Sequence, residues 1–479
     1  MQMQNLRRAQ LAALTGEVLD TLIIGGGING AGTLRDLALR AETSGGRLRL
    51  GLIEQGHFAS GTSGRNSQLI HGGLRYLKYF EFSLVRESLR ERSTLLRIAP
   101  HLVEPLPFLM PMYGWKSRLL YGTGLTLYDL LSGTHGIRKH HVFSRSEVAA
   151  MEPALNTEGL TAGAVFFDCR VHSARLVLAN ILDAMDHGAV AVNYLKVEQM
   201  DRGGDLWNIS ARDTITDETH RVQARKIVDA TGPWGGGVPG GAALRLVRGS
   251  HIIIPRVNAS DNAVAYFDRA GRIVFLIPWG SRRQLTLVGT TDVDHSLGPD
   301  DVHITSDEVA YLLGIVSEVF PQVAKPEVIA SYSSLRPLVP HGPQSATSAS
   351  RGHRIWNSDD GVLHIAGGKY TTYRAMSDEA AELVCREIAP GLCGRGVTDY
   401  VVLPDFPKER EWSLEQHLTD HLYISTYLGY EKKWDAESLG LEAQAMASRM
   451  GWDHSEIAAE VRLAMDGLPA HIAVSPVLT

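Results

Sequence analysis

Residues 18–32 of this chain read VLDTLIIGGGINGAG, a short apolar run that ends in a cluster of glycines. The apolar run is typical of a buried parallel strand, and residues 33–40 (TLRDLALR) continue with helical spacing. At the junction, Gly25, Gly27 and Gly30 form a G-x-G-x-x-G pattern. In this pattern the first glycine permits a tight turn, the second lets a pyrophosphate approach the backbone, and the third lets the helix pack on the strand. The stretch therefore predicts a strand, a phosphate-binding turn and a helix, in that order.

A second apolar strand follows the predicted helix and ends at an acidic residue. Residues 48–53 read LRLGLI and lead into Glu54, which lies 24 residues after Gly30. An acid about 20 residues beyond the glycines is placed to accept a hydrogen bond from an adenosine ribose hydroxyl. Together these features predict a dinucleotide-binding site, although the pattern alone does not separate NAD from FAD. The alternative is a glycine-rich loop in an unrelated α/β fold.

The composition excludes several classes of protein. The chain has 479 residues, 44% hydrophobic and 21% charged, which is typical of a globular protein rather than a coiled coil, a collagen-like fibre or a disordered chain. Its formal net charge of -6 disfavours nucleic-acid binding, for which a basic excess is usual. Three cysteines cannot build a disulfide framework and suit a reducing cytosol. We find no run of about 18 apolar residues and therefore expect a cytoplasmic protein without a transmembrane helix.

The stretch after Glu54 separates the two cofactors. Residues 57–77 read HFASGTSGRNSQLIHGGLRYL, and together with GGGINGAG at 25–32 they closely resemble the FAD-dependent glycerol-3-phosphate dehydrogenases of the D-amino-acid-oxidase-like flavoprotein superfamily. Further matches occur in order at residues 99–103 (APHLV), 105–108 (PLPF), Asp168, 174–180 (ARLVLAN), Asn193 and following, 229–234 (DATGPW), 248–251 (RGSH), 272–279 (RIVFLIPW), 289–292 (GTTD), 331–338 (SYSSLRPL) and 367–374 (GGKYTTYR). So many motifs in one order are far more specific than any one of them.

The resemblance implies an α/β fold. A Rossmann-like FAD-binding domain would be joined by a second, antiparallel-sheet substrate domain and a short helical C-terminal region. The predicted segments are 18–75, 155–240 and 355–395 for the discontinuous FAD-binding domain, 76–154 and 241–354 for the substrate domain, and 396–479 for the helical region. Residues 250–254 (SHIII), 273–277 (IVFLI) and 285–288 (LTLV) predict strands of the substrate domain, since Gly, Pro or charged residues bound each one.

The resemblance also assigns cofactor contacts residue by residue. The predicted FAD-binding residues are Gly25, Gly27, Ile28, Asn29, Gly30, Glu54, Gln55, Thr62, Ser63, Asn66, Ser67, Leu69, His71, Gly72, Val197, Ala230, Gly232, Gly367, Gly368, Lys369, Thr371 and Thr372. Lys369 follows two glycines and is expected at the edge of the flavin. No segment has EF-hand spacing, and we predict no metal site.

The activity that the resemblance implies is the oxidation of sn-glycerol 3-phosphate, which requires cations to hold the phosphate. The predicted phosphate-binding residues are Arg75, Arg336 and Arg351, with Arg354 as the alternative to Arg351, because arginine keeps its charge and forms bidentate pairs with phosphate oxygens. Tyr76, next to Arg75, is expected to form a wall of the substrate pocket. The simpler interpretation is that these arginines are ordinary surface residues.

The same reaction requires a base for the hydroxyl proton and a group that stabilises the developing charge. His251 is the predicted proton acceptor, because histidine titrates near neutral pH. Lys369 is expected to stabilise the reduced flavin or to hold a substrate oxygen. With Arg336, these two are the predicted catalytic residues, and Lys369 is also counted among the substrate-binding residues. The simpler interpretation of His251 is a buried core histidine.

The resemblance further implies how the reaction proceeds and with what partners. A small phosphorylated polyol would be oxidised to dihydroxyacetone phosphate by hydride transfer to flavin N5, and electrons would pass to a quinone or to oxygen. Any attachment to the inner membrane would be peripheral, since no span is expected. A homodimer stays open, and no nucleic-acid partner is expected.

Two departures from the family keep other interpretations open. Asn66 and Gln68 stand where more Ser- and Lys-like residues are expected beside the flavin, and the chain after about residue 395 is short and poorly matched. The alternative is a related flavoprotein that acts on another small anionic hydroxy or amino substrate. The arginine, lysine and histidine candidates disfavour a flavin-binding protein without turnover. The GTSGRNSQLIHGG stretch disfavours an NAD-dependent dehydrogenase.

Overall fold

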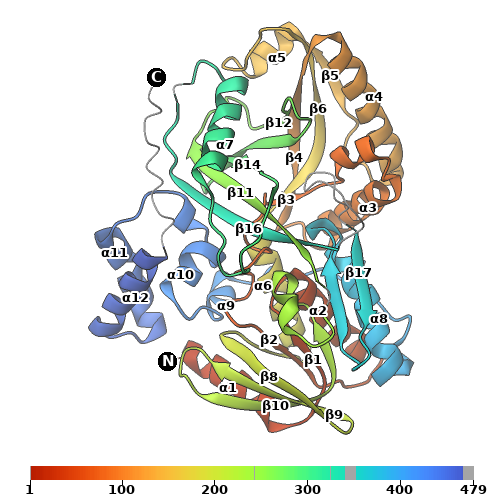
Figure 1. Cartoon of the computed structure of the whole chain (residues 1–479), viewed down its shortest axis with the longest axis vertical. Helices are drawn as coiled ribbons and strands as arrows, with labels where there is room; N and C mark the ends of the chain where they lie inside the picture. The colour runs from red at the N-terminus through yellow and green to blue at the C-terminus, as the bar shows by residue number, and fades with distance from the viewer. Residues whose placement is uncertain (1, 242, 324, 340–351, 468–479) are drawn as a thin grey trace.

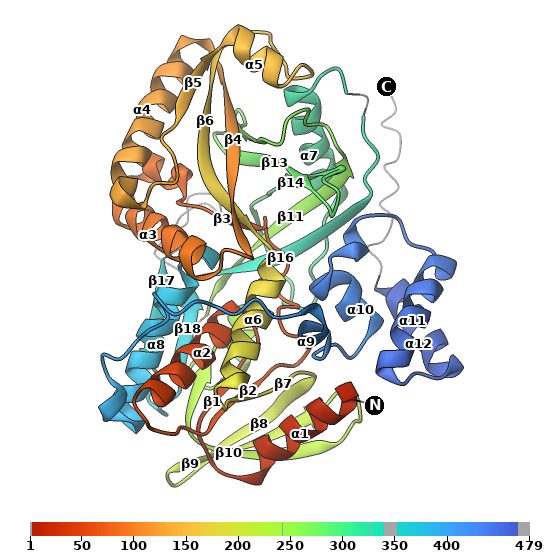
Figure 2. The same ribbon diagram turned by 180° about the vertical axis from the view of Figure 1, so that it is seen from behind.

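The structure is a computed structural model that describes residues 2–241, 243–323, 325–339 and 352–467 (Figure 1). Two β-sheets form its framework, one in the lower and one in the upper half of Figure 1, and a group of helices near the C-terminus lies beside them. Figure 2 shows the same two halves from behind, with β4 and β6 in the upper one. The arrangement confirms the predicted α/β class with a second sheet and a helical C-terminal region.

The first sheet is mostly parallel at its centre. Its order is β17-β18-β10-β1-β2-β7, and β9 and β8 extend it from β10. Its strands are β1 (Leu19–Ile24), β2 (Leu50–Ile53), β7 (Val190–Val192), β8 (Leu195–Gly203), β9 (Leu206–Asp213), β10 (Thr219–Asp229), β17 (His353–Asn357) and β18 (Leu363–Gly367). Strand β1 runs parallel to both β2 and β10, as the predicted strand, helix and strand require.

Helices cover both faces of β1, which explains the continuous apolar run Leu22–Ile24 at its end. Ile23 packs in one core cluster with Leu34 of α2, whereas Leu22 packs in another with Leu14 of α1. Successive side chains of a strand point to opposite faces, so a strand covered on both sides carries apolar residues on both of its faces, as Leu22, Ile23 and Ile24 do here. The helices of this half are α1 (Gln2–Gly16), α2 (Ile28–Thr43), α6 (Ser173–Asp186) and α8 (Tyr373–Ile388), the last two beside α2.

The second sheet is mainly antiparallel. Its order is β15-β11-β14-β13-β12-β4-β6-β3, with β16 beside β11 and β5 beside β6. Its strands are β3 (Leu69–Ile70), β4 (Val103–Tyr113), β5 (His141–Ser144), β6 (Leu160–Val171), β11 (Arg245–Pro255), β12 (Ala263–Phe267), β13 (Ile273–Trp279), β14 (Leu285–Gly289), β15 (Val293–Asp294) and β16 (Ala330–Leu338). The three strands predicted from the sequence lie in β11, β13 and β14. Strand β6 pairs with β4 although it falls inside the predicted 155–240 segment, and the domain boundaries themselves stay a prediction.

One face of this second sheet is covered by α7, and the other faces the first sheet. Ile252 and Val288 pack with Leu312 of α7 in one core cluster. Ile253, which points to the opposite face, belongs to the large cluster that also contains the α2 core. The helices of this half are α3 (Phe82–Ile98), α4 (Gly114–Ser132), α5 (Arg145–Met151) and α7 (Ser306–Val319).

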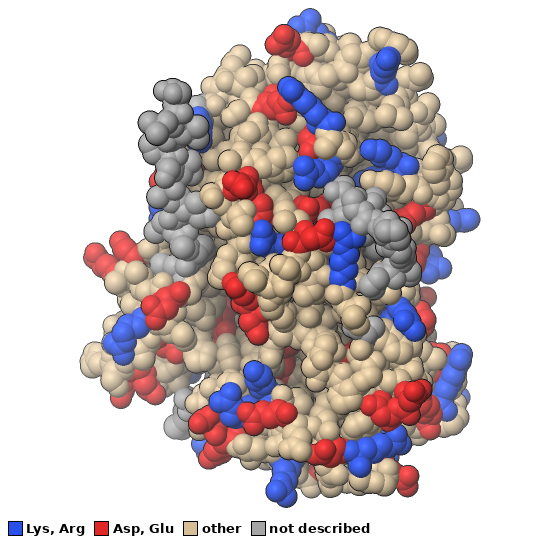
Figure 3. Space-filling model, in the orientation of Figure 1, with Lys and Arg blue, Asp and Glu red and all other residues tan. Residues whose placement is uncertain are grey.

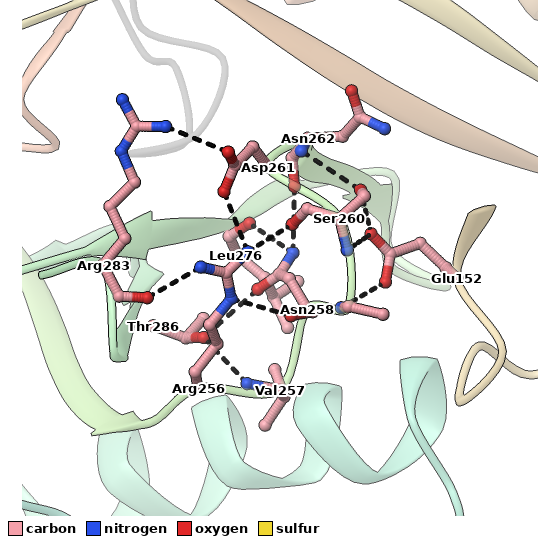
Figure 4. A network of polar contacts seen from close by, with 11 residues as sticks. Glu152, Arg256, Val257, Asn258, Ser260, Asp261, Asn262, Leu276, Arg283 and Thr286 are labelled. Carbon is pink, nitrogen blue, oxygen red and sulfur yellow. Dashed lines mark hydrogen bonds and ion pairs between the residues drawn. The ribbon is translucent and has the colours of Figure 1, made fainter.

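A polar network fixes the loop that follows β11 (Figure 4). The buried Glu152 carboxylate accepts hydrogen bonds from the backbone N–H groups of Ala259 at 2.7 Å and Ser260 at 3.0 Å. Arg256 donates to the backbone oxygen of Asn258 at 2.8 Å. A buried carboxylate is stable only when such partners satisfy it, so the network has a structural explanation. None of these five residues lines the cleft described below.

The C-terminal helices have a core of their own and also contact the main body. Leu418, Leu439 and Met446 form a separate cluster, and Arg175 of α6 pairs with Glu411 at 2.7 Å. The region contains α9 (Lys408–Trp412), α10 (Leu418–Asp420), the π-helical turn η6 (His421–Ser425), η7 (Leu428–Tyr430), α11 (Ala436–Met450) and α12 (His454–Asp466). Short 3₁₀ turns elsewhere are η1 (Leu74–Tyr79), η2 (Gly133–His135), η3 (Gly232–Gly237), η4 (Tyr370–Thr372) and η5 (Pro390–Leu392). No helix in the described part of the chain combines the length and the apolar composition needed to cross a bilayer.

Candidate active site

A cleft of about 1040 Å³ opens between the two sheets. Residues that directly follow β1, β2 and β10 line one side, and residues of β11 and β16 line the other. In sheets with parallel strands, ligands bind outside the carboxyl ends of the strands, which is where the first sheet meets this cleft. The volume is large enough for a dinucleotide-sized ligand, since pockets for drug-sized molecules measure about 300–1,000 Å³.

Most of the predicted site residues line this cleft. The predicted FAD-binding residues among them are Gly25, Gly27, Ile28, Asn29, Glu54, Gln55, Thr62, Ser63, Asn66, Ser67, Leu69, His71, Val197, Ala230, Gly232, Gly367, Gly368, Lys369 and Thr371. The predicted substrate-binding and catalytic residues among them are Arg75, Tyr76, His251, Arg336 and Lys369. Gly30, Gly72 and Thr372 are not part of the lining. Arg351 lies outside the described residues.

The glycine turn has the geometry that a pyrophosphate-binding loop requires. Gly25 has φ of 111°, in the left-handed region that favours glycine, and a Cβ there would lie 2.5 Å from the Ala230 carbonyl oxygen. A Cβ on Gly30 would overlap the carbonyl oxygen of Gly25, so this glycine permits close packing of helix and strand and does not face the cleft. Next to the turn, the Ile28 N–H at the start of α2 donates to the Ser63 hydroxyl at 2.9 Å. Gly27, Ile28 and Asn29 line the cleft, so the start of the helix faces the place where an anionic ligand would bind.

Glu54 is held at the end of β2 by two backbone donors. The Gly26 N–H donates to Oε2 at 2.7 Å and the Gly56 N–H donates to Oε1 at 2.9 Å. Burial raises the pKa of the Glu54 carboxyl, and these two donors act in the opposite direction. Each carboxylate oxygen keeps further acceptor capacity, which ribose hydroxyls can use. The turn, the helix start and this acid therefore fit the adenosine and pyrophosphate half of FAD.

The segment at 62–71 is tied to β16 and to η4, the turn that follows β18, and these bonds fix the part of the cleft that would hold the flavin. The Thr62 hydroxyl donates to the Leu335 carbonyl at 2.6 Å, and the His71 N–H donates to the Thr371 hydroxyl at 3.1 Å. These bonds join stretches of chain nearly 300 residues apart. The cradle is therefore assembled by tertiary contacts and not by local sequence.

Gln68, in this segment, and Gly72, directly after it, are not part of the cleft lining. Gln68 was expected beside the flavin, but its Oε1 accepts hydrogen bonds from the Ser173 N–H and hydroxyl, both at 2.9 Å. Gly72 donates its N–H to Asp168 at 3.1 Å, and a Cβ there would overlap the Tyr128 hydroxyl. Gln68 and Gly72 thus serve packing between elements.

Two of the predicted phosphate-binding arginines converge on one buried carboxylate. Arg75, on η1, has Nη1 3.4 Å from Oδ2 of Asp292, and Arg336, on β16, has Nη1 3.1 Å from Oδ1. Arg336 also donates to the Thr290 hydroxyl at 2.9 Å and to the Thr291 carbonyl at 3.2 Å. The Asp292 side chain is only 4% exposed. Sequence reasoning assigned no role to Asp292, although its GTTD motif at 289–292 was a usable signal.

Lys369 and Tyr76 lie together next to this arginine pair. The Lys369 Nζ donates to the Ser88 hydroxyl at 2.9 Å and lies 4.0 Å from the centre of the Tyr76 ring. The Arg75 guanidinium is 5.0 Å from the centre of the same ring. The Tyr76 ring thus contacts two cations, each at a distance typical of a cation–π interaction. Ser88, on α3, was not identified from the sequence.

His251 lies at the boundary between the flavin-side loop and the arginine pair. Its Nε2 shares a hydrogen bond with the Ser67 hydroxyl at 2.8 Å, while its buried Nδ1 has no partner among the described residues. Burial, reinforced by the charge of Arg336, lowers the pKa of His251 to about 3. The ring is therefore neutral at physiological pH and can accept a proton. Its orientation is fixed by the Tyr332 ring, stacked at 4.9 Å with an interplanar angle of 26°.

The C-terminal region supplies part of the cleft wall, which sequence reasoning did not anticipate. Tyr423 and Tyr430 line the cleft. The Tyr430 ring lies 5.1 Å from that of Tyr332 and 4.9 Å from that of Tyr423. Tyr427 anchors this segment, because its hydroxyl donates to the Gly64 carbonyl at 2.9 Å. The region matched the family poorly, so no motif drew attention to these tyrosines.

Comparison with known proteins gives a consistent family match. The family described as "DAO: FAD dependent oxidoreductase" matches residues 20–374 of the chain. A glycerol-3-phosphate dehydrogenase of Synechocystis sp. is 38% identical over 395 residues, which cover 76% of this chain and 69% of that protein. An alpha-glycerophosphate oxidase of Streptococcus pneumoniae is 33% identical over 449 residues, which cover 79% of this chain and 72% of that protein.

Solved structures agree on the fold. A glycerol-3-phosphate dehydrogenase from Bacillus halodurans, complexed with FAD, superposes with a TM-score of 0.75 at 23% identity and covers 99% of this chain and 98% of its own. An L-alpha-glycerophosphate oxidase from Mycoplasma pneumoniae, also with FAD bound, gives 0.60 at 19% identity, covering 77% of this chain and 95% of its own. At these identities the likeness establishes the fold alone.

Proposed function

This chain belongs to the FAD-dependent oxidoreductase family, and on that premise we propose that it oxidises sn-glycerol 3-phosphate to dihydroxyacetone phosphate. The observation that carries the proposal is that Arg75 and Arg336 both line the cleft, together with His251, and are held close to each other by their shared partner Asp292. Two guanidinium groups at one place fit a phosphate, because each can form charge-assisted, bidentate hydrogen bonds with its oxygens. The curated relatives named for this substrate support the same assignment.

The residues of the cleft fit FAD as the cofactor. The glycine turn leaves no room for a side chain, the start of α2 faces the cleft, and Glu54 offers acceptors to a ribose. When bound, FAD supplies the two-electron acceptor, at flavin N5, for the hydrogen on C2 of the substrate. We assign Thr62, Ser67, His71 and the other cleft-lining residues predicted from the sequence to this cofactor.

We assign to His251 the role of proton acceptor for the C2 hydroxyl. Its neutral ring can take the proton, but burial and, to a smaller extent, the charge of the neighbouring Arg336 disfavour the charged imidazolium. A phosphate bound to Arg336 offsets that charge and so raises the pKa of His251. Binding of the phosphate therefore makes the base stronger when the substrate is present.

Lys369 and Tyr76 complete the proposed substrate pocket. The Lys369 ammonium is fixed by Ser88 and by the Tyr76 ring, so it can hold a substrate oxygen without a large loss of side-chain freedom. As a cation it also stabilises negative charge that develops as the hydroxyl loses its proton. Arg351, the third predicted phosphate ligand, stays a prediction.

We further propose that a quinone or oxygen accepts the electrons. The relative named a dehydrogenase supports a quinone as the acceptor, and the relative named an oxidase supports oxygen. Mixing reduced enzyme with air-saturated buffer or with a soluble quinone under nitrogen distinguishes the two classes by the rate of flavin reoxidation. Peripheral membrane contact and a homodimer stay predictions, the latter to be tested by light scattering.

The function is tested by anaerobic titration of the purified holoenzyme. Glycerol 3-phosphate should bleach the flavin absorbance stoichiometrically, and glycerol at the same concentration should not. Bleaching by another small anionic hydroxy acid or by an amino acid, with none from glycerol 3-phosphate, would favour the alternative substrate class. Full flavin binding without bleaching by any of these compounds would contradict both.

A further inference from the structure

Strand β11 presents alternate residues to the cleft and to the helix α7 behind it. His251 lines the cleft, and a Cβ on Gly249 would lie 2.3 Å from Nη2 of Arg336, so both residues face the substrate pocket. Arg248 and Ser250 point to the opposite face, because successive side chains of a strand alternate. On that face the side chains of both residues bind one carboxylate of α7.

The carboxylate belongs to Glu308, which is only 5% exposed. Its Oε2 pairs with Nη2 of Arg248 at 2.8 Å. Its Oε1 accepts hydrogen bonds from the Ser250 hydroxyl at 2.8 Å and from the Thr291 hydroxyl at 2.7 Å. Burial acts to raise the pKa of Glu308, but the hydrogen bonds that it accepts outweigh burial and hold this pKa below its ordinary value. The group is therefore an anion at neutral pH.

Thr291 connects this anion to the arginine to which we assign the phosphate. Its hydroxyl donates to Glu308, and its backbone carbonyl accepts a hydrogen bond from Nη1 of Arg336 at 3.2 Å. The same hydroxyl accepts from the N–H of Ser250, at 2.9 Å, and so ties the loop to the residue that precedes His251. One buried carboxylate thus contacts the support of both the proposed phosphate ligand and the proposed proton acceptor.

Capping of α7 does not explain this arrangement by itself. Glu308 completes a capping box, in which its Oε2 accepts from the N–H of Thr305 at 3.0 Å. Glu147 of α5 and Glu456 of α12 complete the same motif at exposed positions. Figure 3 shows charged side chains of both signs spread over the surface of the molecule, which is their usual place. Glu308 instead is buried, and its second oxygen turns to the back of β11 and to the Thr291 loop.

We propose that Glu308 is a positioning residue for the oxidation, which holds β11 and the Thr291 loop so that Arg336 and His251 keep one fixed arrangement. It is not a catalytic residue, because it does not line the cleft. A buried ion pair contributes little net stability, since desolvation offsets the attraction, so its main contribution here is a defined geometry. This role rests on the proposed function.

The test compares FAD-loaded, full-length variants in kinetics and in calorimetric binding of inorganic phosphate. Glu308→Ala should lower kcat/KM for glycerol 3-phosphate about 10- to 100-fold, since a misplacement of about 1 Å can cost about 100-fold. It should weaken phosphate binding about fivefold, equivalent to ~1 kcal/mol, and leave the FAD content unchanged. Thr291→Val removes only the link between the carboxylate and the loop, and should reproduce part of both losses.

Glu308→Gln tests whether geometry or charge is needed. Its amide can turn the oxygen to Arg248 and the NH₂ to the hydroxyls of Ser250 and Thr291, which can accept as well as donate. We therefore expect this variant to recover most of the kcat/KM and of the phosphate affinity that Glu308→Ala loses. A loss as large as that of Glu308→Ala would overturn a role in geometry.

Two controls separate positioning from helix capping. Thr305→Ala removes the other half of the α7 capping box, and Glu147→Ala removes the equivalent glutamate of α5, both at exposed positions. Each should lower the free energy of unfolding. Neither should change kcat/KM or phosphate affinity by more than about twofold, because neither side chain contacts β11 or the Thr291 loop.

Several results would overturn the proposal. Wild-type kcat/KM and phosphate affinity in Glu308→Ala, or an equal loss in Thr305→Ala, would reduce Glu308 to a helix cap. If Glu308→Ala does not fold, wild-type values in Thr291→Val would have the same meaning. A wild type whose flavin is not reduced by glycerol 3-phosphate would contradict the proposed function, and the phosphate affinities would then decide the positioning alone. A wild type that does not bind phosphate would contradict both.

Discussion

The cofactor half of the cleft is built mainly from backbone groups, whereas the substrate half is built from charged side chains. In the first half the glycine turn, the start of α2 and the donors to Glu54 form the surface. In the second half Arg75, Arg336 and Asp292 hold one another through ion pairs, and Lys369 lies against Tyr76. The first half depends on chain geometry, so a small change of backbone should destroy it. The second half depends on charge, so substitutions in it should leave the protein folded but lower its catalytic activity.

The largest effect is expected at the glycine turn. Gly30→Ala places a methyl group against the Gly25 carbonyl oxygen, a fixed backbone atom, so relief requires α2 to move away from β1. We expect a cost of about 3–5 kcal/mol and near-complete loss of FAD after gel filtration. The control is Gly440→Ala on α11, where a Cβ meets nothing within 4 Å and should stabilise slightly. Wild-type FAD content in Gly30→Ala would show that this packing is not needed.

The next effect is expected in the substrate half. Arg336→Ala should lower kcat/KM for glycerol 3-phosphate about 30-fold to several-thousand-fold, the equivalent of ~2–5 kcal/mol for a lost charge contact in a desolvated site. FAD content should not change, and Arg336→Lys should recover only part of the activity, because lysine lacks the fork. The control is Arg245→Ala, which removes an exposed pair with Asp294. The measurement is the ratio of kcat/KM for glycerol 3-phosphate to that for glycerol. A high ratio that persists in Arg336→Ala would mean that other residues bind the phosphate.

The lowered pKa of His251 predicts how the free energy of unfolding depends on pH. Its folded-state pKa, about 3, lies below the ordinary 6.5, so between these values the unfolded chain binds a proton that the folded chain does not. Stability is therefore lost as the pH falls below about 6.5, at ~1.4 kcal/mol per unit, or about 2 kcal/mol at pH 5.

The measurement is denaturant unfolding at pH 6.5 and pH 5. His251→Gln should reduce the loss of unfolding free energy between pH 6.5 and pH 5 by about 2 kcal/mol. His303→Gln, at an exposed site, should leave that loss unchanged. An equal acid sensitivity of wild type and His251→Gln would mean that the histidine is protonated in the folded protein.

A smaller effect is expected at the acid of the cofactor half. Glu54→Gln keeps the shape of the side chain but presents an amide NH₂ to one of two backbone donors, Gly26 or Gly56. We expect FAD to bind about tenfold more weakly, in line with ~1.5 kcal/mol for a hydrogen bond to a charged group. Turnover at saturating FAD should stay within about twofold, because the ribose lies far from the reacting atoms. Fluorescence titration of the apoprotein gives the first quantity, and a loss of turnover at saturating FAD would contradict the placement.

The smallest effect is expected at the shared carboxylate. Asp292→Asn removes the anion that Arg75 and Arg336 share, and inorganic phosphate should then inhibit about fivefold more strongly, equivalent to ~1 kcal/mol. Competitive inhibition constants measure this directly. Weaker inhibition by phosphate would instead show that Asp292 mainly orients the two guanidinium groups.

The two halves also differ in how far the sequence predicted them. The residues of the glycine turn and Glu54 are close in sequence, and their spacing follows from one strand, one helix and a second strand. Their positions therefore follow from the sequence pattern alone. Asp292 and Ser88 were missed, because each acquires its role only from residues that approach from another part of the chain. Gln68 was expected beside the flavin but lies outside the cleft lining, because the sequence does not show which way a loop side chain points.

The sequence by itself determined the α/β class, the family, the FAD-binding turn and the identity of the charged candidates. Only the tertiary structure decided that Arg75 and Arg336 meet at Asp292 and that tyrosines of the C-terminal region line the cleft. It also decided that the apolar residues of α4 face outward, because the helix is apolar on both sides and its sequence does not show which side is covered. Short-range patterns follow from local geometry, whereas contacts across hundreds of residues depend on how whole sheets pack against each other.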